Sequence, residues 1–271
     1  MEFFTARNAL DAGDLPALTA VLDEHPDVVR FRCRQGEWYE RGYFAGAMLL
    51  HHVAGNPIRC QLPVNIVEVT RLLLERGADP NATCGKGGRV VGLLLTSRQA
   101  SEAGVALPLV ELLIEAGAQA DLDRPDVLDD PLWNQAPATA EALIRRGSPL
   151  ALRHAAALGR LDLMAELIGS ADQDVREEAL LLATVRGQLD SARILVSHGA
   201  RGDKIGRRGP ATALHEAANR GFPQIVALLL EHGADATVLD TRFGGTAEEW
   251  AEYGRPEDLP AMRALFGQRP S

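Results

Sequence analysis

Apolar residues along the chain gather in short runs, and each run ends at a glycine. Leucine and isoleucine at positions i, i+3 and i+4 predict one helix with a buried stripe in each run. The glycine that follows suits a left-handed helix C-cap. These glycines recur after 30 to 52 residues, which indicates a repeated unit. The runs are LLLERGADPNA (72–82), LLIEAGAQAD (112–121), ALIRRGSPL (142–150), ILVSHGARGD (194–203) and LLLEHGADAT (228–237).

A second pattern precedes these runs, and its best copy is TALHEAANRG (212–221). The small alanine pair predicts a first helix that packs closely against its neighbour, and Thr212 suits an N-cap. Weaker copies begin at Leu50, Leu152 and Leu181. A single helix pair cannot bury its own apolar face, so the pairs must stack and the ends need capping.

Residues 212–221, followed by IVALLL (225–230), resemble the ankyrin repeat pattern T-P-L-H-x-A-A-x-x-G, with Ala213 at the usual proline. On this resemblance the chain is identified as a soluble, bacterial-type array of ankyrin repeats. The resemblance implies an all-α solenoid of about eight helix-turn-helix repeats with hairpin loops. It also implies a non-catalytic scaffold that binds a protein or peptide partner in its concave groove.

The array is predicted to form one domain over residues 1–271. Its expected parts are an N-terminal capping repeat (1–30), an aromatic insertion loop (31–46), central repeats (47–236, degenerate over 121–149) and a C-terminal capping repeat (237–271).

Composition excludes several classes of function. The net charge is −9, with 37 acidic and 28 basic residues, whereas nucleic-acid binding depends on basic residues. No apolar run approaches the roughly 20 residues that span a bilayer. Cys33, Cys60 and Cys84 lack metal-ligand spacing and are expected to be reduced thiols. We therefore expect a cytoplasmic monomer with no cofactor, no metal, no nucleic-acid partner and no membrane association.

The insertion loop holds five of the chain's thirteen aromatic residues. Two interpretations remain open at this point. Because tyrosine, tryptophan and arginine dominate binding hot spots, one interpretation of the loop is a binding lip. Alternatively, its rings cover the apolar flank of a short N-terminal cap. The aromatic residues are Phe31, Trp38, Tyr39, Tyr43 and Phe44.

Histidines mark the first helices. His51 and His215 occupy the T-P-L-H position, where the resemblance implies bonds to the backbone of neighbouring turns. His52 and His154 are interpreted as lying one residue later, facing the groove. The full set predicted to contact a partner is Trp38, Tyr39, Tyr43, Phe44, His52, Asn56, Asn134, His154, Glu216 and Arg220.

The sequence gives little support for catalysis. No Ser-His-Asp order, HExxH motif or Walker loop is present, and GKGG (85–88) lacks the GxxxxGK[ST] frame. The alternative hypothesis is an ankyrin scaffold that holds a small molecule in a pocket near the aromatic loop, with catalysis as an extension of that role.

A basic turn, RGDKIGRRG (201–209), also has two interpretations. It either steers an acidic partner toward the protein or forms a solvated finger of the repeat.

Overall fold

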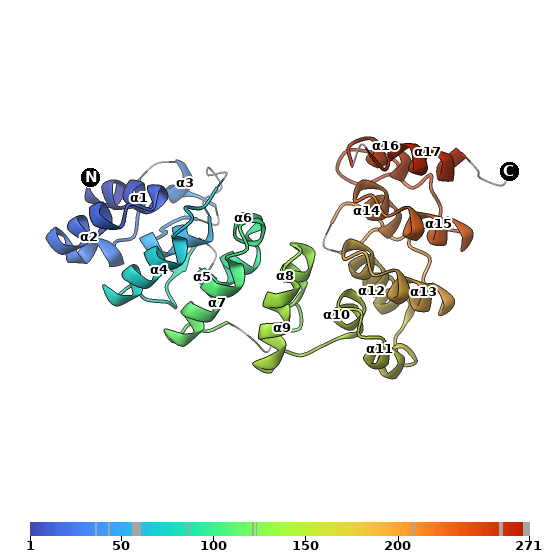
Figure 1. Ribbon diagram of the computed structural model, residues 1–271, viewed down its shortest axis with the longest axis horizontal. Helices are drawn as coiled ribbons and strands as arrows, with labels where there is room; N and C mark the ends of the chain where they lie inside the picture. Colours follow the sequence, from blue (N-terminus) through green and yellow to red (C-terminus); the bar gives the residue numbers. More distant parts are fainter. Residues whose placement is uncertain are drawn as a thin grey trace. The chain divides into compact units, whose positions relative to one another are not determined.

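The computed structural model describes residues 1–35, 37–42, 44–55, 61–85, 87–120, 122, 124–207, 209–254 and 257–267, apart from the side chains of Glu37 and Trp38. These residues form two compact units, Met1–Ser148 (the N-terminal unit) and Pro149–Ser271 (the C-terminal unit). Each unit contains four helix pairs among its described residues (Figure 1).

In the C-terminal unit, each first helix packs on the next first helix and each second helix on the next second helix. Figure 1 shows this ladder of pairs. The pairs are α10 (Leu152–Ala157) with α11 (Leu161–Ile168), α12 (Gln173–Val185) with α13 (Leu189–Ser197), α14 (Ala213–Asn219) with α15 (Pro223–Glu231), and α16 (Ala247–Glu252) with α17 (Leu259–Gly267).

Local sequence explains these pairs. The alanine pair Ala217 and Ala218 on α14 is buried, so the neighbouring first helices can approach closely. The Thr212 side chain accepts the N–H of His215 and caps α14. Gly202 lies where the loop crosses α15: its φ is +78°, and a Cβ there would stand 2.8 Å from Leu229 Cδ2. Only glycine combines that backbone conformation with so close an approach.

The N-terminal unit follows the same plan with more irregular elements. Its first helices after α1 are short, and a 3-10 helix, η2, replaces one of them. A two-stranded antiparallel ladder pairs Thr83 with Arg89 and Cys84 with Gly88. The elements are α1 (Glu2–Ala12), α2 (Leu15–Glu24), η1 (Pro26–Arg30), α3 (Glu37–Glu40), η2 (Leu49–Ala54), α4 (Ile66–Glu75), β1 (Thr83–Cys84), β2 (Gly88–Arg89), α5 (Val90–Leu95), α6 (Arg98–Glu102), α7 (Ala106–Glu115), α8 (Asp129–Trp133) and α9 (Pro137–Arg145).

The predicted fold class is confirmed. The described residues form stacked helix pairs joined by turns, and β1 with β2 is the one ladder among them. The apolar runs read from the sequence become α4, α7, α9, α13 and α15. The grouping of all 271 residues into one domain stays a prediction.

We expect Leu229→Ala to lower the free energy of unfolding by about 2–5 kcal/mol, because Leu229 is fully buried on α15. Glu231→Ala, at the exposed end of the same helix, should change it by less than about 0.5 kcal/mol. Urea denaturation followed by circular dichroism measures both. Equal losses in the two variants would show that the buried face of α15 is wrongly assigned.

Candidate functional site

The aromatic segment of the N-terminal unit is largely buried. Tyr39 and Phe44 are 3% and 2% exposed. The Tyr39 ring lies 5.9 Å from that of Phe3 on α1 and 6.3 Å from that of Phe44, measured between centroids. The expectation that these two rings form a projecting lip is therefore wrong, because both are buried: Tyr39 packs against α1, and Phe44 packs against His51 and His52 of η2. Their geometry matches the other interpretation, a cover on the N-terminal repeat.

The two remaining residues of that predicted lip cannot be placed. Tyr43 lies outside the described residues, and so does the side chain of Trp38. Asn56, predicted for the groove, lies outside them as well. Their contact with a partner stays a prediction.

His52 is buried and does not face an open groove. Its ring lies 5.1 Å from the Phe44 ring, and its Nε2 is 3.3 Å from the Tyr39 hydroxyl. That hydroxyl also accepts from Arg7 Nη1 at 3.3 Å. His52 therefore belongs to the polar centre of the N-terminal aromatic cluster, and its predicted exposure is wrong.

Three histidines share one structural role. The backbone N–H of the N-cap residue donates to Nδ1 of His51, His154 and His215, from Met48, Ala151 and Thr212. Because Nδ1 accepts, the proton lies on Nε2, which donates to Ala82 O in His51 and to Gly245 O in His215, at 3.1 and 3.0 Å. The structural role predicted for His51 and His215 is confirmed.

The structure corrects the predicted position of His154. The alanine pair at 155–156 aligns it one residue after the T-P-L-H histidine, but α10 has six residues where α14 has seven. Counted from the N-cap, His154 is the third residue of its helix, like His215, and its side chain is buried. The predicted groove-facing position is therefore wrong.

The remaining predicted contacts are bound within their own units. Asn134, at the end of α8, donates to Leu95 O at 3.3 Å. Glu216 Oε2 accepts from Arg220 Nε at 2.7 Å along one face of α14. Glu216 is buried and Arg220 half-buried, so this ion pair presents little surface of its own.

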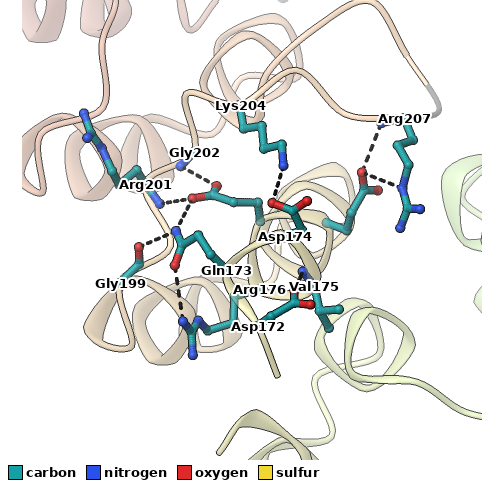
Figure 2. A network of polar contacts seen from close by, with 12 residues as sticks. Asp172, Gln173, Asp174, Val175, Arg176, Gly199, Arg201, Gly202, Lys204 and Arg207 are labelled. Carbon is teal, nitrogen blue, oxygen red and sulfur yellow. Dashed lines mark hydrogen bonds and ion pairs between the residues drawn. The ribbon is translucent and has the colours of Figure 1, made fainter. Parts of the chain in front are cut away.

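The basic turn is held by acidic residues of α12 (Figure 2). The buried Glu177 carboxylate accepts the N–H groups of Arg201 and Gly202 at 2.9 and 3.1 Å. Lys204 pairs with Asp174, and the Arg207 N–H donates to Glu178 at 3.1 Å. Arg208 lies outside the described residues. These contacts favour the interpretation of the turn as a finger of the repeat.

A hollow that the sequence analysis did not identify lies at the end of the C-terminal unit. Its volume is about 700 Å³. It is flanked by two of the most exposed large apolar side chains of the described chain, Phe243 at 72% and Tyr253 at 86%. We call it the C-terminal aromatic pocket; its principal lining residues are Asn219, Phe243, Glu249, Trp250, Glu252 and Tyr253.

Asp240 fixes the loop that carries Phe243. Its carboxylate accepts the N–H groups of Arg242, Phe243 and Gly245 at 2.8, 2.7 and 2.8 Å and Trp250 Nε1 at 3.0 Å. Burial raises the pKa of this carboxyl, but these donors outweigh burial and hold the pKa well below its usual range. The loop and α16 are thus joined by one ionised side chain.

A sequence signal for this pocket exists. Thr246 and Glu249 form a capping box, in which the Thr246 N–H donates to Glu249 Oε2 at 2.7 Å. Glu249 is therefore the third residue of α16, as the histidines are in their helices. The fourth residue of α16 is Trp250, which corresponds to His52 on η2 and Glu216 on α14. The alignment of the first helices from the sequence did not place Trp250 at this position.

The comparisons with known proteins agree with this architecture. Residues 152–240, inside the C-terminal unit, match the family model described as ankyrin repeats (3 copies). Residues 152–240 therefore carry ankyrin repeats. Ankyrin repeats generally form scaffolds that bind other proteins, and solenoids of this kind offer extended surfaces for that purpose.

Individual relatives share only part of the chain. A stretch of 70 residues is 39% identical to the palmitoyltransferase ZDHHC13 of Pongo abelii, Homo sapiens and Mus musculus. It makes up 25% of this chain, which spans 11% of the length of each of those relatives. The crystal structure of the human ASB11 ankyrin repeat domain aligns over 98% of both chains, with 19% identity and a TM-score of 0.44.

The described residues hold no group of three or more histidine, cysteine, aspartate or glutamate side chains that could bind a metal ion. None of their helices is long and apolar enough to cross a membrane.

The pH dependence of stability tests the role of His51. Burial lowers the pKa of His51 to about 4, whereas an unfolded histidine titrates near 6.5. Between these pH values the unfolded chain binds a proton on this histidine and the folded chain does not. The contribution of neutral His51 to the free energy of unfolding is therefore complete above pH 6.5. It is lost as the pH falls toward 4, by about 3 kcal/mol in total.

We therefore expect His51→Gln to be less stable than the wild type at pH 7.5, with a difference that shrinks at pH 4.5. Urea midpoints of both proteins across this range measure the effect. A difference that is the same at every pH would contradict a buried neutral imidazole.

Proposed function

We propose that this chain is a non-catalytic scaffold that binds a protein or peptide partner at the C-terminal aromatic pocket. The observation that carries the proposal is the exposure of Phe243 and Tyr253 beside a hollow of about 700 Å³. The exposure of two aromatic rings to water is unfavourable. Burying them against a partner gains a free energy of about 25 cal/mol per Å² of apolar surface. Aromatic residues in such positions are typical binding hot spots.

The rigidity of the pocket supports the same role. Phe243 sits on a loop whose backbone N–H groups are held by Asp240, and Trp250 is held by the same carboxylate. A pre-ordered surface loses less conformational entropy when a partner binds. The pocket is therefore suited to recognition without a large rearrangement.

The end of α14 joins this surface. Asn219 lines the pocket, and its neighbour Arg220 pairs with Glu216 on the same helix. Since α14 packs on α16, Asn219 brings the end of α14 to the pocket, whereas the largely buried Glu216–Arg220 pair does not line it. In this proposal Asn219 orients a partner segment whose anchor lies between Phe243 and Tyr253.

We expect Tyr253→Ala to weaken partner binding by about 2 kcal/mol while leaving the melting temperature nearly unchanged, because the ring is largely in water. The matched variant is Phe31→Ala, which removes a half-exposed ring from the aromatic segment of the N-terminal unit. Partners are captured from source-cell extract with each variant and quantified by mass spectrometry, and affinities are then measured with the purified partner. Loss of binding in Phe31→Ala alone would move the site to the N-terminal unit.

A second candidate function rests on a different hollow, of about 510 Å³, near the aromatic segment. Arg32, Arg34, Tyr39 and Glu40 are among its lining residues. Among the described residues Arg34 has no hydrogen-bond or ion-pair partner, which favours an anionic small molecule there.

Binding of a sugar phosphate, followed by calorimetry, tests this candidate. We expect Arg34→Gln to weaken it by about tenfold, which is the loss of one charge-assisted hydrogen bond. Arg41→Gln, an exposed arginine outside the hollow, should leave it unchanged. Absence of binding by the wild type at millimolar concentration would reject the second candidate.

A further inference from the structure

The C-terminal aromatic pocket lies in an acidic part of the chain. Residues 231–258 contain eight acidic and two basic residues. Two of the acidic side chains, Glu249 and Glu252, line the pocket itself, and both are exposed. A ligand with a negative charge would meet these carboxylates, whereas a positive charge would be attracted to them.

The rings of the pocket favour the same charge. Phe243, Trp250 and Tyr253 come together around one hollow, and a cation is attracted to the face of an aromatic ring. The apolar stem of a lysine or arginine can also pack on such rings while its charged end reaches a carboxylate. The combination of three rings and two carboxylates therefore matches a long basic side chain.

The chain's own arginines already make both kinds of contact at this site. The guanidinium carbon of Arg242 lies 5.1 Å from the centroid of the Phe243 ring. Arg263 Nη2 lies 2.9 Å from Glu252 Oε1. Both contacts are largely exposed, so they hold these arginines weakly and an incoming basic side chain can share or replace them.

We infer that the partner presents a lysine or arginine side chain to the C-terminal aromatic pocket, next to an apolar residue that covers Phe243. This inference rests on the proposed binding function and specifies the chemistry of the partner segment. The basic side chain lies between Glu249 and Glu252 with its stem on the rings of Trp250 and Tyr253.

Selection from a random heptapeptide library on the immobilised wild-type protein tests the inference. The expected result is enrichment of sequences with a lysine or arginine beside an apolar residue. The tightest peptide is then compared with an analogue in which norleucine replaces the basic residue, so that the stem stays and the charge is lost. The analogue should bind about tenfold more weakly, as should the original peptide with Glu252→Gln.

Glu231→Gln is the matched control, because it removes an exposed carboxylate of the same unit that lies outside the pocket. It should leave affinity unchanged. Glu252→Gln is expected to fold normally, since its ion pair with Arg263 is exposed. Equal losses in the two variants would show a general effect of net charge and overturn the inference.

The remaining outcomes separate the inference from the proposed function. Enriched peptides that lack a basic residue but fail to bind Tyr253→Ala would overturn the inference and leave the binding function standing. Absence of enrichment, or enriched peptides that bind Tyr253→Ala as tightly as the wild type, would reject both.

Discussion

A polar acceptor at the third position of the first helix holds the starts of four described helices, η2, α10, α14 and α16, in place. His51, His154, His215 and Glu249 each accept the backbone N–H of their N-cap residue. In His51 and His215 the opposite nitrogen also donates to a carbonyl beyond the following second helix. One side chain thus caps the start of a helix and bonds it to the following repeat. The orientation of the later residues on that helix depends on this fixed start.

This constraint explains how far the sequence could be interpreted. The glycine-ended apolar runs and the TALHEAANRG pattern predicted the helix pairs correctly, because buried stripes and C-caps leave a periodic record. The position of each residue within its first helix was harder to predict from the sequence. Counting from the alanine pair assumes helices of equal length, and α10 and α16 are each one residue shorter than α14. That difference placed His154 in the groove and passed over Trp250.

The candidate site was predicted less well for a second reason. An aromatic residue has the same sequence signal whether it covers a core or projects into water. Tyr39 is buried because α1 supplies Phe3 and Arg7 as partners, and Phe44 is buried against His51 and His52 of η2. The sequence around residue 39 does not indicate the contacts with α1. Phe243 is exposed because Asp240 fixes its loop, through bonds between residues two to ten positions apart. These local bonds depend on the conformation of the turn, which composition does not encode.

The Asp240 clamp separates the shape of a loop from the identity of its tip. Three of its four acceptor contacts are to backbone N–H groups, which any residue except proline supplies. Side chains at positions 242 and 243 can therefore change while the path of the chain stays the same. The loop therefore combines a fixed backbone with variable side chains. Replacing only these two positions offers a route to new binding specificities without redesigning the repeat beneath them.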